Sequence, residues 1–356
     1  MGESKMGKYN LEELYNQVKE GVATLDFEQI WEEFKPLKFA LYDDQKCYFN
    51  GKYIEKTADF CANTAIEFQG ETIAIWNVVE ELKPSILASK IVHEMFHAFQ
   101  MVQGWDCWAR ELEALYKYQY NAENLSIKLN ENILLLELLK EFNESKYHEL
   151  MRLRKYRSEK FPYEFSYETK VEAIEGSATY VEWQVLKQLD MDSADIFVEK
   201  MEKVMTKPEY FFPIRISSYN TGALLIYAMN CAEEYSFTSK ERPVIVSVLK
   251  KIPSLQNMDD KIMIDAEVDK ALRVFTEESK SIVEAALGRN EVALKGPLEL
   301  DGLNIYDARC YNGYLTSRIG LRYKENGESK LFRGDSVIRM TDESTIDTVY
   351  KWVSCR

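Results

Sequence analysis

The chain has 356 residues, 46% of them hydrophobic and 29% charged, which is typical of a globular protein with a sizeable core rather than of a disordered chain. Glycine (15 residues) and proline (8 residues) are scarce, which favours long helices and disfavours an all-β or repeat architecture. The formal net charge of −14 would repel a phosphate backbone, so we expect no nucleic-acid partner.

Neither a secretion signal nor a membrane span is evident. The opening residues, MGESKMGKYNLEELYNQ, include no apolar stretch, and the longest nearly apolar runs, 133–139 and 222–232, are too short to cross a bilayer. The 6 cysteines lie far apart without a CxxC pair, so we expect free thiols. These features favour a cytoplasmic protein with no membrane partner.

The first predicted elements are one or two amphipathic helices over about 11–33, where apolar residues recur at three- and four-residue steps. From about 39 to 79, β-branched and aromatic residues predict a small, mainly antiparallel sheet. A helix over about 85–103 follows, with Pro84 at its start and Gly104 just after its end.

Helices dominate the next part of the chain, which we predict to be a helical body over 105–288. Apolar periodicity places helices within 108–155 and over about 168–189, 218–234 and 265–287. After Lys295 the sequence alternates like strands. Pairs typical of tight turns are Asn50-Gly51, Gln69-Gly70, Asn312-Gly313 and Asn326-Gly327. We therefore predict an α+β protein with a mainly helical domain over 1–290 and a β-rich C-terminal subdomain over 291–356.

The most informative motif is His93-Glu94-Met95-Phe96-His97, in the middle of the helix predicted over 85–103. Residues four apart share one face of a helix, so both imidazoles can bind one metal ion while Glu94 reaches a metal-bound water. Because the chain has 3 histidines, this pattern would arise by chance in about two or three chains in a thousand. We interpret His93 and His97 as metal ligands and Glu94 as a general base.

A catalytic zinc site needs a third protein ligand and an open position for water. His148 lies in a polar run that is typical of an exposed helix. Gln100 and Gln103 occupy the glycine and third-histidine positions of the longer HExxHxxGxxH motif, so that motif is absent. The third ligand is then expected to be a carboxylate.

Glu175 is the preferred carboxylate because its predicted helical face is otherwise apolar, where an unpaired carboxylate is costly and a metal would relieve the cost. Glu172 and Glu182 are the alternatives on the same helix. Small residues at Gly176 and Ala178 would allow this helix to approach the HExxH helix closely.

HEMFH followed by EGSATYVE resembles the gluzincin metallopeptidases, the group that contains thermolysin-like and aminopeptidase N-like enzymes. In the aminopeptidase branch the third zinc ligand stands in an E-G-x-A-x-Y-x-E run, which residues 175–182 fit position by position. Residues 219–223, YNTGA, are similar to the Y-x-x-G-A stretch whose tyrosine donates to the oxyanion. The resemblance covers roughly 72–230. It implies a zincin-like (gluzincin) catalytic domain with zinc ligands His93, His97 and Glu175, the base Glu94 and the oxyanion donor Tyr219.

The chain departs from this family pattern at two points. No glycine-rich G-x-M-E-N-like segment precedes the HExxH helix. Thr179 stands where thermolysin-like enzymes carry an acid that orients a zinc-bound histidine, so another residue is expected to take that role, with Glu172 as a candidate.

The sequence thus predicts a zinc metallopeptidase that binds one Zn²⁺ ion and hydrolyses peptide or polypeptide substrates. Two alternatives stay open: a catalytically inactive binding or regulatory protein with the gluzincin fold, and a metal-dependent amidase acting on a non-peptide substrate. The strand over 71–77 would pair with an extended peptide if it is an exposed edge strand, or it is internal with both edges paired. A solvated helix face is expected for the basic residues Arg152, Arg154, Lys155, Arg157 and Lys160.

Overall fold

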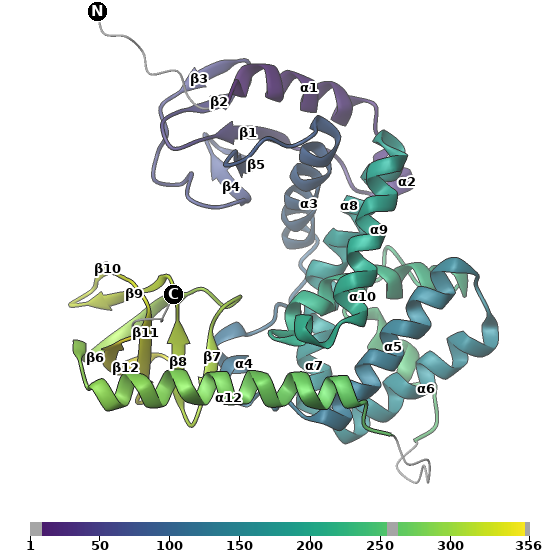
Figure 1. The fold of residues 1–356 in the computed structure, drawn as a ribbon. Helices are drawn as coiled ribbons and strands as arrows, with labels where there is room; N and C mark the ends of the chain where they lie inside the picture. The colour runs from purple at the N-terminus through teal and green to yellow at the C-terminus, as the bar shows by residue number, and fades with distance from the viewer. Residues whose placement is uncertain (1–8, 255–262, 353–356) are drawn as a thin grey trace, which may run out of the picture.

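The computed structural model describes residues 9–254 and 263–352. They form an α+β protein with a five-stranded sheet near the N-terminus, a helical middle and a seven-stranded sheet near the C-terminus (Figure 1). The predicted α+β class is confirmed. Among these residues, no helix combines the length and the apolar character that a membrane span requires.

The N-terminal sheet has the strand order β3-β2-β1-β5-β4. Its strands are β1 (Lys38–Tyr42), β2 (Cys47–Phe49), β3 (Lys52–Ile54), β4 (Thr64–Phe68) and β5 (Glu71–Asn77). All neighbouring pairs are antiparallel except β1 and β5, which are parallel, so the predicted, mainly antiparallel sheet is confirmed and contains one parallel pair at its centre. The turn residues mark the local hairpins, whereas the pairing of β1 with β5 joins distant segments that no turn signal connects.

Strand β5 is internal, because it pairs with β1 on one side and with β4 on the other. Within the described residues β4 is an edge strand of this sheet. The choice that the sequence left open for residues 71–77 is therefore resolved in favour of an internal strand.

Helix α3 (Pro84–Val102) carries the HExxH motif and has proline in its first turn. It packs against α1 (Leu11–Ala23), β5 and a later helix, α8. Ile91, Val92, Met95 and Phe96 are at most 1% exposed and belong to the main hydrophobic core. The opposite side of α3 holds His93 and His97, both partly buried. Packing on one face thus fixes the direction of the two imidazoles.

The remaining helices are α2 (Phe27–Ile30), α4 (Glu111–Lys117), α5 (Ala122–Lys140), α6 (Glu144–Lys160), α7 (Pro162–Val171), α8 (Ser177–Leu189), α9 (Met191–Thr206), a 3₁₀ turn η2 (Pro208–Phe211), α10 (Ile214–Cys231), α11 (Val244–Leu249) and α12 (Ala266–Arg289). Most of them form the body drawn on the right of Figure 1, while α12 runs along the bottom of the view beneath the C-terminal sheet, with α4 beside β7. A π-helical turn, η1 (Glu172–Gly176), joins α7 to α8 without a break in the helical backbone. Such turns are uncommon and often occur at functional sites.

Gly176 approaches α10 rather than the HExxH helix. A Cβ atom added at Gly176 would lie 2.6 Å from the Cα atom of Gly222, and one added at Gly222 would lie 2.5 Å from the carbonyl oxygen of Glu172. The prediction that Gly176 serves the approach to α3 is therefore wrong. Two glycines meet where η1 crosses α10, because the backbones leave no room for a side chain.

The prediction of a solvated face for the basic run on α6 is wrong for Arg154 and Arg157, although Lys160 is exposed. Arg154 and Arg157 are 0% exposed. They belong to an ionic cluster of Lys128, Glu131, Arg154, Arg157, Glu168 and Glu172, in which each arginine contacts two glutamates. Three cations thus face three carboxylates drawn from α5, α6, α7 and η1. A charge run looks exposed in sequence because these partners become neighbours only in the fold.

The C-terminal sheet has the order β10-β9-β6-β12-β11-β8-β7. Its strands are β6 (Val292–Leu303), β7 (Arg309–Tyr311), β8 (Tyr314–Ser317), β9 (Gly320–Glu325), β10 (Glu328–Arg333), β11 (Ser336–Met340) and β12 (Thr345–Lys351). The turns at Asn312-Gly313 and Asn326-Gly327 have positive φ angles at both residues, as a tight hairpin requires. The sheet packs on α4 and α12, which attach it to the helical body.

Candidate metal centre

The two histidines of the HExxH motif and Glu175 converge at one point. The Nε2 atoms of His93 and His97 lie 3.1 Å apart. Glu175, carried by η1, places its Oε2 atom 3.4 Å from Nε2 of His97 and 3.9 Å from Nε2 of His93. Segments almost eighty residues apart in the sequence thus present two nitrogens and one oxygen to a common centre.

This arrangement fits a small divalent cation. Bonds of about 2.0–2.1 Å at tetrahedral angles place ligand atoms about 3.3 Å from one another. The three separations found here, 3.1, 3.4 and 3.9 Å, lie near that value. Two imidazoles and a carboxylate suit zinc and leave a fourth position for water.

Each histidine has an outer partner on its other ring nitrogen. Nδ1 of His93 lies 3.2 Å from Oε2 of Glu182, and Nδ1 of His97 lies 2.8 Å from Oε1 of Gln100. Gln100 is itself held, because its amide donates to the carbonyl oxygen of Ile174 at 2.7 Å. An Nδ1 hydrogen of His97 directed at Gln100 leaves its Nε2 lone pair for a metal, and the Glu182 carboxylate beside Nδ1 of His93 favours the same tautomer there.

The other candidates from the sequence have different partners. Glu172 belongs to the ionic cluster, where Lys128 and Arg154 bind its carboxylate, so the prediction that it orients a histidine is wrong. Glu182 contacts Nδ1 of His93, the nitrogen that faces away from the common centre. His148 is exposed on α6 and is not part of the candidate metal group.

The local charges favour an ionised Glu175 carboxylate. Burial raises its pKa, but the two histidines and Arg215 outweigh this and lower the pKa to about 2. Burial lowers the pKa of His93, but the carboxylates around it, Glu182 first, outweigh this and raise the pKa above its ordinary value. Glu175 is therefore charged at neutral pH, as a metal-binding carboxylate must be.

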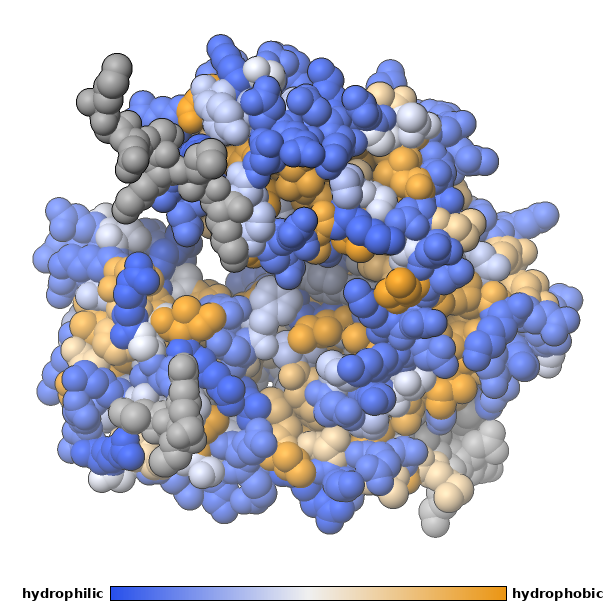
Figure 2. All heavy atoms as spheres, turned by 45° about the horizontal axis from the view of Figure 1, so that its top comes forward, coloured by the Kyte–Doolittle hydropathy of each residue, from blue (hydrophilic) through white to orange (hydrophobic). Residues whose placement is uncertain are grey.

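A cleft of about 750 Å³ is lined by His93, His97 and Glu175. In Figure 2 the surface is hollowed between the parts that contain the two sheets. Glu94 and Tyr219 both line the cleft. Its apolar walls are formed by Trp76, Met101, Trp108, Phe197 and Ile216, and the residues at the start of β4, Asn63, Thr64 and Ala65, form one rim.

Tyr219, on α10, lies in a hydrogen-bond network with residues that the sequence did not indicate. Nη2 of Arg215 donates to the Tyr219 hydroxyl at 2.5 Å and to Oε1 of Glu175 at 3.0 Å. Nη1 of Arg215 lies 2.6 Å from Oε1 of Glu111. The hydroxyl of Tyr306, from the C-terminal part of the chain, lies 2.9 Å from that of Tyr219.

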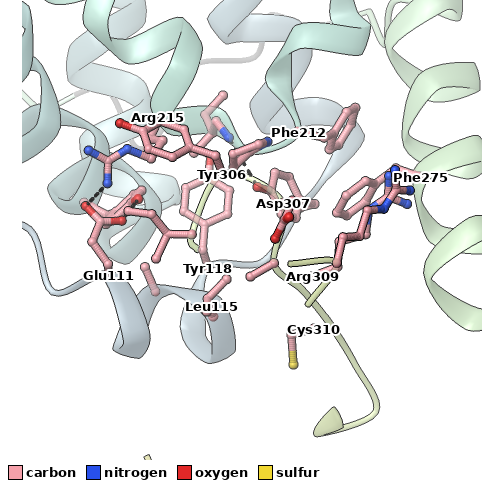
Figure 3. A pocket seen from close by; sticks show the side chains of 18 residues that line it. Glu111, Leu115, Tyr118, Phe212, Arg215, Phe275, Tyr306, Asp307, Arg309 and Cys310 are labelled. Carbon is pink, nitrogen blue, oxygen red and sulfur yellow. Dashed lines mark hydrogen bonds and ion pairs between the residues drawn. The ribbon is translucent and has the colours of Figure 1, made fainter. Parts of the chain in front are cut away.

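Arg215 also lines a second cavity, of about 240 Å³, between the helical body and the C-terminal sheet. Figure 3 shows Arg215 and Glu111 joined at one side of this cavity, with Tyr306 beside them and Phe275 on the far side. Tyr306 lines both this cavity and the cleft, so it lies between them.

A search of protein-family models, of curated proteins and of solved structures finds no significant match to this chain.

Proposed function

We propose that the protein is a zinc-dependent peptidase with a gluzincin-like catalytic domain. The observation that carries the proposal is the convergence of His93, His97 and Glu175 on one point, beside Glu94 and at the floor of an open cleft. The outer contacts of Glu182 and Gln100 add support, because metal-binding histidines usually have such partners.

Each of these residues has a role in amide hydrolysis. When bound, a zinc ion supplies an acidified water molecule and polarises the substrate carbonyl. Glu94 accepts the proton of the attacking water and delivers it to the leaving nitrogen. Tyr219 donates its hydroxyl hydrogen to the carbonyl oxygen as negative charge develops there.

The free edge of β4 favours a polypeptide substrate. Among the described residues β4 pairs with β5 alone, and the residues at its start form a rim of the cleft. An extended peptide can add to such an edge through main-chain hydrogen bonds, which would lay its backbone across the cleft. This arrangement supports a peptide substrate over a small non-peptide amide.

The test combines metal analysis with turnover. Protein purified without added zinc is expected to contain one zinc ion per chain and to cleave a mixed peptide library. Glu94→Gln should retain the metal and lose about 10²–10⁴-fold in kcat, since the substitution removes the general base. Glu81→Gln, at an exposed position just before α3, is the matched control and should behave as wild type.

Two results would contradict the proposal. Zinc binding without cleavage of any peptide would favour a catalytically inactive binding protein. Cleavage that is unchanged in Glu94→Gln would show that the catalytic site lies elsewhere.

A further inference from the structure

The C-terminal sheet contributes a side chain to the cleft. Tyr306 lies in the turn between β6 and β7, and it lines the cleft together with Tyr219. Asn304 stabilises the turn through two hydrogen bonds. Its side-chain oxygen accepts from the backbone N–H of Tyr306 at 3.1 Å, and its backbone carbonyl oxygen accepts from the backbone N–H of Ala308 at 3.1 Å. The backbone on both sides of Tyr306 is therefore anchored.

The turn is also fixed relative to the helical body. Leu298 and Leu300 of β6 share a hydrophobic cluster with Leu112 and Leu115 of α4. On the other side, Arg309 of β7 lies 2.9 Å from Glu278 of α12. The sheet is thus attached through an apolar contact and an ion pair, so the position of Tyr306 over the cleft follows from packing.

The hydrogen bonds of the Tyr219 hydroxyl reveal a role for Tyr306. A phenolic oxygen has two acceptor lone pairs and one hydrogen. Arg215 can only donate, so its bond to Tyr219 occupies one lone pair. If Tyr306 donates to the second lone pair, the Tyr219 hydrogen is left free to point into the cleft. If Tyr219 instead donates to Tyr306, its hydrogen is not available to a substrate.

We propose that Tyr306 is a positioning residue of the catalytic site: together with Arg215 it saturates the oxygen of Tyr219 and directs the Tyr219 hydrogen at the substrate carbonyl. This inference rests on the proposed peptidase function. It makes the C-terminal sheet part of the catalytic unit. The ring of Tyr306 also covers Arg215, whose guanidinium carbon lies 5.1 Å from the ring centre, and this contact keeps the hydroxyl over Tyr219.

The test is a double-mutant cycle with Tyr219→Phe and Tyr306→Phe. Each change removes one hydroxyl and keeps the ring. Tyr306→Phe is expected to lower kcat about tenfold, the size of effect expected from one hydrogen bond, with KM and zinc affinity unchanged. In the Tyr219→Phe background the same change should have no further effect on kcat, because Tyr306 acts through Tyr219. Tyr311→Phe, on β7 in the same sheet, is the matched control and should leave kcat unchanged.

A second readout uses metal-free protein. The hydrogen bond between the two hydroxyls predicts that Tyr306→Phe lowers the midpoint of thermal unfolding in the wild-type background and not in the Tyr219→Phe background. This measurement needs neither zinc nor turnover, so it tests the contact independently of the proposed function.

Three results would overturn the inference while wild-type cleavage stands: equal losses of kcat in both backgrounds, a change confined to KM, or no effect of Tyr306→Phe. Absence of zinc or of cleavage in the wild type would instead refute the proposed function, and the role of Tyr306 would be refuted with it.

Discussion

Replacing Gly222 with alanine tests the contact between α10 and η1. The added Cβ atom would lie 2.5 Å from the carbonyl oxygen of Glu172 and 2.8 Å from the Cα atom of Gly176. Both neighbours are backbone atoms, which cannot rotate away. Ordinary contacts of a Cβ atom are 3.4–4 Å long, so the two helical segments must separate by about 1 Å.

The effects on stability and on activity differ in size. Overpacking of this kind costs about 1–3 kcal/mol, and the better helix propensity of alanine returns about 0.5–1 kcal/mol. We therefore expect a net loss of about 1–2 kcal/mol in the free energy of unfolding. The separation also moves Glu175, on η1, away from Tyr219, on α10. A misplacement of about 1 Å at a catalytic site lowers the rate about 10²-fold.

Urea unfolding, chelator competition for zinc and peptide turnover measure the three consequences. Gly288→Ala, on α12, is the matched control, because a Cβ atom there meets no atom within 4 Å. This control should be slightly stabilised and fully active. If Gly222→Ala is as stable and as active as wild type, the two backbones are not in contact and our account of how η1 and α10 are held together is wrong.

Two further predictions concern buried carboxylates. Glu182→Gln should weaken zinc binding about 10–100-fold in chelator competition without unfolding the protein, because it replaces the carboxylate beside Nδ1 of His93 with a neutral amide. An unchanged zinc affinity would show that this contact does not orient His93. Burial raises the pKa of Glu168, but Arg157 and Lys128 outweigh this effect and lower the pKa to about 2. The ionised carboxylate therefore contributes fully to the free energy of unfolding above about pH 4.5, and this contribution is lost as the pH falls toward 2. Glu168→Gln should flatten that acid limb of the stability curve and cost about 3–5 kcal/mol at neutral pH, because it removes one of the two carboxylate partners of both Lys128 and Arg157 in a buried cluster; an equally steep limb in the variant would assign the acid sensitivity to other groups.

Much of the candidate ligand set could be predicted because its signals are local. His93 and His97 are four residues apart on a helix whose start and end are marked in the sequence, and such spacing alone places two side chains on one face. Glu175 required a second signal, the E-G-x-A-x-Y-x-E run, together with the cost of an unpaired carboxylate on an apolar face. The structure brings these three side chains together.

The partners of these ligands were beyond prediction because they depend on the packing of distant segments. Gln100 appeared only as a mismatch to another motif, yet it contacts His97. Glu182 was considered as a ligand and instead contacts the outer nitrogen of His93. Arg215 and Tyr306 carried no sequence signal, since each matters through a hydroxyl or carboxylate on another element.

Strand order and burial of charge were unpredictable for the same reason. The periodicity of 71–77 identifies a strand but does not say which strands flank it. In the structure this strand, β5, is internal and β4 lies at the edge of the sheet. Arg154 and Arg157 lie in a run that reads as exposed, because nothing near them in sequence shows the carboxylates of α5, α7 and η1 that enclose them.

The ionic cluster has a consequence for the candidate metal centre. Glu172 is part of the same π-helical turn as Glu175, and the buried cations Lys128 and Arg154 bind its carboxylate. These charges belong to the fold itself, so they hold η1, and with it Glu175, in place independently of any cation. If the candidate centre binds a cation, loading and removal would take place on a folded protein, unlike in small domains that collapse only around their metal.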